Sequence, residues 1–172
     1  MIIFNGPSSS SSGISTISSS KSANALQRPA SAYWAFASLR ETVAGCEACG
    51  LCKSRKNTVF GVGDVQADWM IVGEAPGENE DLQGEPFVGL AGQLLDNMLR
   101  AVGRSRTGAG AQGAYIANVL KCRPPANRNP QPAEVAQCEP YLARQVALVQ
   151  PTIIVAMGRF AVQSLLRTDE PI

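Results

Sequence analysis

Three short apolar runs constrain the fold of this chain more than any other feature. They occupy residues 69–73, 115–120 and 152–158. Each run is rich in β-branched or aromatic residues and lacks the alternation of polar and apolar residues that marks a half-exposed strand. Continuous apolar runs of this length are typical of parallel strands that helices cover on both faces. We therefore predict an α/β fold, with a short parallel sheet in the middle of a three-layer α/β/α sandwich.

Helical periodicity marks four segments, namely residues 33–44, 91–102, 132–149 and 159–167. The third of these begins with Pro132 and stops before Pro151, as expected at the two ends of a helix. Strands and helices that alternate in this order predict right-handed crossovers between parallel strands. In such sheets ligands bind beyond the carboxyl ends of the strands, so the loops after Gly73, Val119 and Gly158 are the places to look for chemistry.

The first 32 residues differ in composition from the rest. Nine serines lie between Ser8 and Ser20, and a segment of this kind buries too little apolar surface to offset its ordering entropy. We expect a disordered tail over residues 1–32, with a transit peptide as the alternative, and one α/β domain over residues 33–172. No apolar stretch reaches the length of about 18 residues that a membrane span needs. Cysteines without a secretion signal indicate a reducing compartment, and we expect a cytoplasmic location.

Five cysteines indicate a metal site. Three of them form the run Cys46-x2-Cys49-x2-Cys52, and Cys122 and Cys138 follow after the second and before the third apolar run. A lone cysteine such as Cys138 is often just a small buried apolar residue, but the run favours metal binding. Zinc and iron–sulfur clusters both accept four thiolates, so spacing leaves the metal open and makes one cysteine, Cys52, a spare thiol.

The loops after the predicted strands carry three side chains with chemical potential. Glu74 follows the first strand, where its carboxylate could orient a water molecule, while Glu78 and Glu80 fit a solvated acidic loop. Phe87 lies in a loop between glycines, as a core residue or as a stacking platform for a planar base. Asn118 lies near the end of an apolar strand, and its amide must bond either to the backbone or to the edge of a base.

Charge is distributed unevenly along the chain. Residues 64–96 contain eight acids and no base, and residues 97–133 contain six bases and no acid. The six bases are Arg100, Arg104, Arg106, Lys121, Arg123 and Arg128. This pattern suits either an ordinary solvated surface or a basic rim that meets phosphates.

Together these segments resemble the family 4 (iron–sulfur, thermostable-type) uracil-DNA glycosylases. The resemblance runs from about residue 39 to residue 166, and six motifs occur in order with compatible spacing. The most specific are Gly73-Glu74-Ala75-Pro76-Gly77, Gly84-Glu85-Pro86-Phe87-Val88-Gly89 and Asn118-Val119-Leu120-Lys121-Cys122-Arg123-Pro124-Pro125.

The resemblance implies an enzyme of base excision repair that hydrolyses the N-glycosidic bond of uracil in single- or double-stranded DNA. We expect it to be a monomer that does not bind membranes. The bond is broken after the uracil nucleotide has been swung out of the duplex. Glu74, Ala75 and Gly77 match the first catalytic motif, in which water and sugar are approached, and Asn118 matches the asparagine that reads the uracil edge. Phe87 matches the aromatic residue that stacks on uracil.

The resemblance also implies a cofactor and a DNA-facing surface. Cys46, Cys49, Cys122 and Cys138 match the ligands of a [4Fe–4S] cluster, and Cys52 does not. Arg123, together with Arg128 and the basic stretch 100–106, would meet phosphates.

One part of the family pattern has no counterpart here. The family carries a second catalytic motif, His-Pro-Ser or similar, after a fourth strand, and this chain contains no histidine. We therefore expect a C-terminally truncated domain whose last strand and helix are missing, with low stability or activity. The alternative function is a non-catalytic iron–sulfur or zinc module that binds DNA or accompanies a polymerase. A redox carrier is the weakest hypothesis, because it leaves Phe87 and Asn118 without a purpose.

Overall fold

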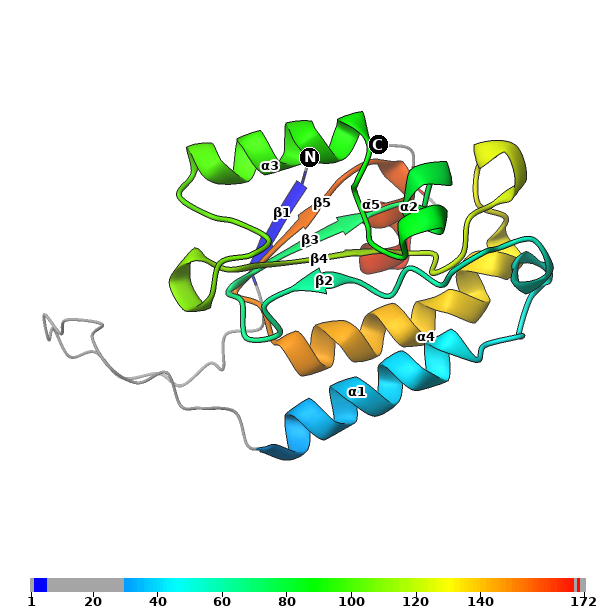
Figure 1. Cartoon of the computed structure of the whole chain (residues 1–172), viewed down its shortest axis with the longest axis horizontal. Helices are drawn as coiled ribbons and strands as arrows, with labels where there is room; N and C mark the ends of the chain where they lie inside the picture. Colours follow the sequence, from blue (N-terminus) through cyan, green and yellow to red (C-terminus); the bar gives the residue numbers. More distant parts are fainter. Residues whose placement is uncertain (1, 6–29, 169, 171–172) are drawn as a thin grey trace, which may run out of the picture.

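The computed structural model describes residues 2–5, 30–168 and 170 of the chain. Its centre is a five-stranded sheet with the strand order β1-β5-β3-β4-β2 (Figure 1). The strands are β1 (Ile2–Asn5), β2 (Val62–Gly63), β3 (Trp69–Gly73), β4 (Ala114–Asn118) and β5 (Ile153–Ala156). The three apolar runs therefore form the three inner strands, as predicted.

The inner strands are parallel and the two edge strands are antiparallel. Strand β3 pairs in parallel with both β4 and β5. Strands β1 and β2 pair antiparallel with β5 and β4 and were not predicted. Strand β2 has only two residues, which is too short for a recognisable periodicity. Strand β1 lies in the segment that was assigned to the disordered tail. The four residues of β1 pair along β5, so the β5 side of the sheet is covered by a further strand. Residues 6–29 of the predicted tail lie outside the described part.

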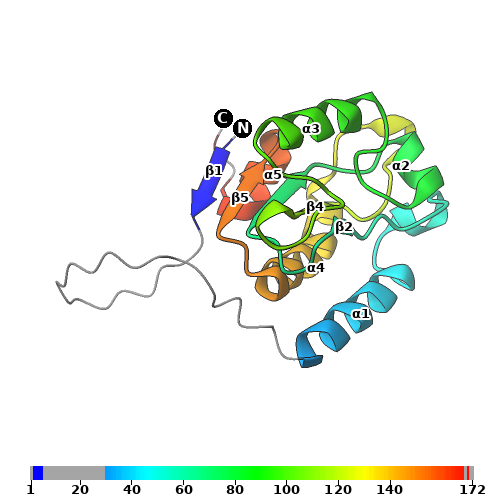
Figure 2. The same cartoon turned by 60° about the vertical axis from the view of Figure 1, so that its left-hand side comes forward.

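Five helices surround the sheet, namely α1 (Ala30–Ala44), α2 (Glu78–Gln83), α3 (Leu90–Ala101), α4 (Pro132–Val149) and α5 (Arg159–Leu166). Helices α1, α4 and α5 contribute to the apolar core on one face of the sheet, and α3 contributes to the core on the other. Figures 1 and 2 show α3 on one side of the sheet and α1 with α4 on the opposite side. This arrangement confirms the three-layer α/β/α sandwich. Helix α2 was not predicted, because its acidic sequence was assigned to a loop.

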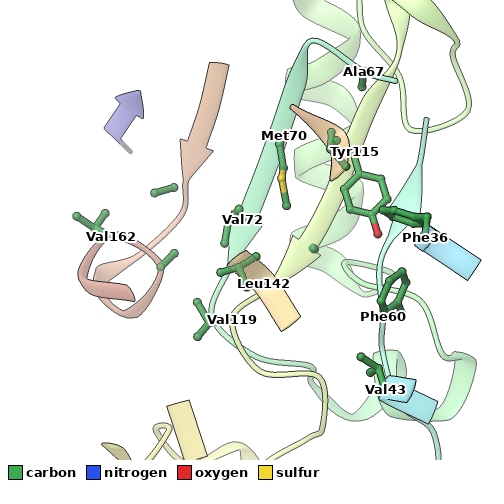
Figure 3. Packing of buried hydrophobic residues seen from close by; sticks show 14 residues of the cluster. Phe36, Val43, Phe60, Ala67, Met70, Val72, Tyr115, Val119, Leu142 and Val162 are labelled. Atoms are coloured by element: carbon green, nitrogen blue, oxygen red, sulfur yellow. The ribbon is translucent and has the colours of Figure 1, made fainter. Parts of the chain in front are cut away.

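The larger core lies between the sheet and the helices α1, α4 and α5 (Figure 3). Phe36 meets the rings of Phe60 and Tyr115 edge to face, at centroid distances of 5.2 and 5.4 Å. The fully buried Gln145 of α4 donates hydrogen bonds to the carbonyl oxygen of Phe60 at 2.8 Å and to the Tyr115 hydroxyl at 3.0 Å. One polar side chain thus joins α4 to the sheet inside an otherwise apolar layer.

Hydrogen bonding continues past the carboxyl ends of β3 and β4. The N–H of Val119 donates to the backbone carbonyl oxygen of Gly73 at 2.9 Å, and the N–H of Leu120 donates to the backbone carbonyl oxygen of Glu74 at 3.0 Å. The two loops that carry the predicted site residues therefore leave the sheet side by side. No helix in the described residues is long and apolar enough to cross a membrane.

Candidate functional site

A cavity of about 320 Å³ lies where β3 and β4 end. Its lining includes Gly73, Glu74, Ala75, Gly77, Phe87 and Asn118. Five of the six side chains or loop residues predicted for catalysis and substrate binding thus share one cavity, and only Arg123 is outside it. The volume is near the lower end of the ~300–1,000 Å³ typical of ligand pockets, which suits one small planar group. A larger groove of about 750 Å³ between α4 and α5 contains none of these residues.

Gly73 brings the ring of Phe87 and the amide of Asn118 together. In the parallel pairing of β3 and β4, Gly73 lies directly opposite Asn118. A Cβ atom on Gly73 would stand only 2.5 Å from Asn118 Oδ1 and 2.5 Å from Phe87 Cζ. The ring and the amide therefore occupy the space that any larger residue would fill. The close packing explains why the strand ends in glycine at this position.

Asn118 has a buried amide oxygen without a partner. The residue is 2% exposed, and among the described residues its Oδ1 accepts no hydrogen bond. Its backbone oxygen is held separately, because Lys121 donates from Nζ at 2.6 Å. Burial lowers the pKa of Lys121 to about 7, so this lysine is not part of a solvated basic rim. An unpaired polar atom in a buried pocket indicates a position for a ligand.

Phe87 lies in a loop that Glu80 holds in place. The Glu80 carboxylate accepts hydrogen bonds from the N–H groups of Val88 at 2.9 Å, Gly89 at 3.1 Å and Gly77 at 3.1 Å. Burial acts to raise the pKa of Glu80, but these backbone donors outweigh it and lower the pKa below its ordinary value. Both residues lie in helix α2 and not in a loop, and only Glu78 is exposed to solvent as predicted.

Glu74 is half-buried at the cavity wall. Burial raises its pKa above the ordinary value, and the nearby positive charge of Arg159 partly opposes this effect. Its neighbour Ala75 packs against the buried cysteines, so the first motif touches both the cavity and the cysteine cluster. A carboxylate in this position can hold and polarise a water molecule at the cavity mouth.

The basic side chains are less available than the sequence suggested. Arg128 forms a two-point ion pair with Glu134, with N–O distances of 2.9 and 2.6 Å. Arg104 lies over the Trp69 ring at 4.6 Å, and Arg106 pairs with Asp96 at 2.8 Å. These three residues were predicted to meet phosphates, but each guanidinium group already has a partner within the chain, although the Arg128 side chain stays 37% exposed.

The Arg123 side chain is 24% exposed, and its acidic partner lies at the surface. It donates to Asn127 Oδ1 at 2.8 Å and lies 3.6 Å from the exposed carboxylate of Glu78. An exposed pair at this distance contributes little to stability and is readily exchanged for another anion.

The cysteines gather in one place although they come from three parts of the chain. Cys122 and Cys138 are buried together with Leu120, and Cys49 packs against them. Burial raises the pKa of Cys122 to about 11; Arg55 opposes this effect, whereas the Cys138 and Cys49 thiols add to it. Tyr141 links Cys46 to the group through a hydrogen bond that helps raise the Tyr141 pKa to about 12.

The cysteines supply a set of possible metal ligands. All five cysteines are free of disulfide bonds, and Arg55 bridges two of the segments by donating to the Cys46 carbonyl at 2.8 Å and to Cys122 Sγ at 3.3 Å. In the described part of the chain, no three Cys, Asp or Glu side chains are arranged to hold a single metal ion. Cys49 and Cys46 act electrostatically on Cys138, and Cys49 and Cys138 on Cys122, so four thiol ligands of the kind that a metal cluster uses are neighbours.

Sequence reasoning missed three residues that shape the cavity. Glu80 had a detectable signal. It lies three residues after Gly77, the residue that caps the start of α2, and an acid at this position commonly accepts a hydrogen bond from the backbone of the capping residue. Met157 also had a signal, since it lies at the carboxyl end of the third apolar run, whereas Arg106 gave none, because it reaches the Phe87 loop from a distant segment.

The family model of the Uracil DNA glycosylase superfamily matches residues 60–170. The type-4 uracil-DNA glycosylase of Archaeoglobus fulgidus is 51% identical over 121 residues, which cover 70% of this chain and 58% of the relative.

Two further relatives carry the same description. The type-4 uracil-DNA glycosylase of Saccharolobus solfataricus is 43% identical over 129 residues, covering 75% of this chain and 58% of the relative. That of Sulfurisphaera tokodaii is 47% identical over 121 residues, covering 70% and 53%. The chain thus spans somewhat more than half the length of the curated relatives it matches.

Proposed function

The chain belongs to the uracil DNA glycosylase superfamily, and from this membership we propose that it excises uracil from DNA by hydrolysing the N-glycosidic bond. One observation carries the proposal: the unpartnered amide oxygen of Asn118 lies in a small cavity beside the Phe87 ring. A planar ligand with hydrogen-bonding groups on its edge could donate to the Asn118 amide oxygen and stack on the Phe87 ring.

Asn118 supplies the groups that match the uracil edge. Uracil presents an N–H donor next to a carbonyl acceptor, and an amide side chain presents an acceptor next to a donor. Oδ1 would accept from the uracil N–H, and the amide nitrogen would donate to the uracil oxygen. Phe87 would stack on the base after it leaves the duplex, because an aromatic ring offers a π-face to any base.

Glu74 would act on the water that attacks the sugar. Ionised Glu74 orients the water and stabilises positive charge as the glycosidic bond lengthens. The bond breaks with its electron pair on uracil, and the Asn118 amide nitrogen stabilises the negative charge on the uracil oxygen. Water adds to the sugar carbon and gives up a proton that neutralises the departing uracil, which leaves an abasic site and free uracil. Ala75 and Gly77 shape the loop so that backbone closely approaches the sugar.

Arg123 would contact phosphate at the cavity rim. Its present pairing with exposed Glu78 is weak, which supports its availability to DNA. The protein would act as a monomer on single- or double-stranded DNA in the cytoplasm. Five free cysteines support a reducing compartment.

Cys46, Cys49, Cys122 and Cys138 would hold a [4Fe–4S] cluster. The packing of Cys49 against the buried Cys122 and Cys138 supports this set, as does the electrostatic effect of Cys46 and Cys49 on Cys138. Cys52 would be the spare thiol. The cluster would join the segment after α1 to the loop after β4 and to α4. Hydrolysis transfers no electrons, so its role here is structural.

The test is uracil release from a uracil-containing single-stranded oligonucleotide, detected as alkali-labile abasic sites. Asn118→Ala should lower the rate by about a hundredfold or more, as for the loss of one stabilising donor in an active site. Asn97→Ala removes an exposed amide on α3 and should leave the rate unchanged. Equal activity of the Asn118→Ala variant and the wild type would remove Asn118 from the site.

The absence of histidine from all 172 residues favours a second candidate, a non-catalytic iron–sulfur or zinc module that binds DNA or accompanies a polymerase. The same assay separates the two. The binding module would retain uracil-containing DNA in the cavity without producing abasic sites, and Asn118→Ala would then weaken retention alone.

A further inference from the structure

Phe87 holds a backbone conformation that its residue type rarely adopts. Its φ angle is +54°, in the left-handed region where the Cβ of an L-residue is crowded. Such a conformation costs free energy and persists only where surrounding contacts impose it. The contacts that impose it therefore decide where the Phe87 ring lies.

Two charged side chains bind the backbone of the loop around Phe87. Glu80 accepts the N–H groups of Val88 and Gly89. Arg106 donates from Nη1 to the carbonyl oxygen of Pro86 at 2.9 Å and from Nη2 to that of Phe87 at 2.8 Å. Every residue from 86 to 89 thus has a backbone polar group bound by a charged side chain.

Arg106 is itself fixed by Asp96 of α3. Its Nε donates to Asp96 Oδ1 at 2.8 Å, and the Arg106 side chain is only 13% exposed. All three guanidinium nitrogens are engaged, and the planar fork of the guanidinium suits two adjacent carbonyl oxygens. The side chain is therefore not available for the phosphate contact suggested by the basic stretch 100–106.

Helix α3 leaves the loop no room to shift toward it. Gly92 is buried in the first turns of α3, and a Cβ atom there would clash with the Phe87 carbonyl group. The Phe87 carbonyl thus lies between the backbone of α3 and the Arg106 guanidinium. Removal of Arg106 would free the loop to relax toward an ordinary backbone conformation.

We propose that Arg106, held by Asp96, is the positioning residue that fixes the Phe87 ring beside Asn118 in the cavity. The inference rests on the proposed function, in which Phe87 stacks on the extruded base. Arg106 touches neither base nor phosphate and acts only through Phe87. The stacking surface is therefore set by an arginine that is distant in sequence from every motif of the cavity.

The first test measures uracil release by Arg106→Gln. The value of kcat/KM should fall about ten- to a hundredfold, because misplacing a positioning group by ~1 Å has an effect of that size. Arg106→Lys keeps the charge but lacks the two-point fork, and it should recover part of the loss. Arg144→Gln, on the exposed face of α4, should match the wild type.

Two comparisons separate positioning from DNA contact. The dependence of DNA affinity on salt should be the same for Arg106→Gln and the wild type, since no phosphate contact is removed. In a Phe87→Ala background, Arg106→Gln should add no further loss. A reduced salt slope, or two losses that multiply, would overturn the proposal.

A readout without substrate distinguishes this inference from the proposed function. Amide hydrogen exchange at Val88 and Gly89 should be about tenfold faster in Arg106→Gln, while the amides of β3 and β4 keep wild-type protection and report an intact fold. Unchanged exchange at Val88 and Gly89 overturns the inference whatever the activity. Faster exchange in Arg106→Gln, together with a wild-type protein that releases no uracil, would support the positioning role and reject the proposed function.

Discussion

Gly73 shows how a residue without a side chain can define a site. The strand must end where two side chains from other segments, Phe87 and Asn118, converge on its Cα. Neither side chain is near Gly73 in sequence, and both depend on its lack of a Cβ. At this scale, the cavity is a consequence of one strand register and one missing methyl group.

The acid limit of activity should depend on Arg159. In the proposed mechanism ionised Glu74 orients the water, so activity should fall as the pH drops through the pKa of Glu74, which burial has raised. Arg159 favours the ionised form, and Arg159→Gln should therefore raise this pKa further. The acid limb of kcat/KM against pH should move to higher pH, measured on uracil-containing single-stranded DNA.

Arg167→Gln provides the control for this profile. Arg167 lies just after α5 and pairs with Glu139 at 3.1 Å, away from the cavity lining. Its acid limb should coincide with that of the wild type. An unshifted profile for Arg159→Gln would show that Glu74 does not set the limit.

Helix α2 illustrates what an element contributes beyond its own stability. It has only six residues, yet Glu80 binds the Phe87 loop and Asp81 binds the segment that follows the first cysteines. The buried Asp81 carboxylate accepts the N–H groups of Lys56 at 2.9 Å and Asn57 at 3.2 Å. One short helix therefore connects the cavity to the loop that carries Cys46 and Cys49.

Helix α4 should depend on Gln145 for its attachment to the sheet. Gln145→Leu leaves the carbonyl oxygen of Phe60 and the hydroxyl of Tyr115 buried without this partner. The free energy of unfolding should fall by about 1–3 kcal/mol, the cost of an unsatisfied buried polar group. Urea denaturation followed by circular dichroism measures it.

Two variants check the cause of this loss. Gln163→Leu removes an exposed hydrogen bond on α5 and should change stability by less than about 0.5 kcal/mol. Adding Tyr115→Phe to Gln145→Leu removes the orphaned hydroxyl and should restore part of the stability. If Gln145→Leu behaved like Gln163→Leu, the buried amide would not be what joins α4 to the sheet.

At the scale of the whole molecule, the cysteines come from segments that the sheet does not join. Cys46 and Cys49 follow α1, Cys122 follows β4, and Cys138 lies in α4. Arg55 already links two of these segments through Cys46 and Cys122. A cluster bound to the four thiols would hold the loop that carries Arg123 beside the cavity.

Cys122→Ser should therefore lose the cofactor and stability together. Protein purified without oxygen should be brown, with broad visible absorbance and about four irons per chain, if a [4Fe–4S] cluster is bound. Cys122→Ser should lose colour and iron and melt at a lower temperature, because binding of a group to the folded state stabilises it.

Cys52→Ser is the matched control, since Cys52 lies in the same run as Cys46 and Cys49. It should keep the colour, the iron and the melting temperature of the wild type. Zinc in place of iron in the purified protein, or equal losses in both variants, would contradict the proposed ligand set.

The sequence alone determined the parts of this protein that depend on local patterns. The inner strands and the four longer helices follow from apolar runs and helical periodicity, because each element must bury its own apolar face. Glu74 and Asn118 could be named in advance because strand ends converge at one edge of a parallel sheet. Phe87 was singled out as an aromatic residue in a glycine-bounded loop, and Ala75 and Gly77 came from the resemblance to the glycosylase family. The cavity confirms that they lie together, while their roles stay predictions.

Only the tertiary structure decided which charged side chains face the solvent and which are committed within the fold. Lys121, Arg104, Arg106 and Arg128 looked like a basic rim, but each is paired or buried by a partner from elsewhere in the chain. The edge strands β1 and β2 likewise exist through pairing with β5 and β4. The physical reason is the same in both cases. The partners of a short strand or of a charged side chain are residues distant in sequence, so the local sequence does not identify them.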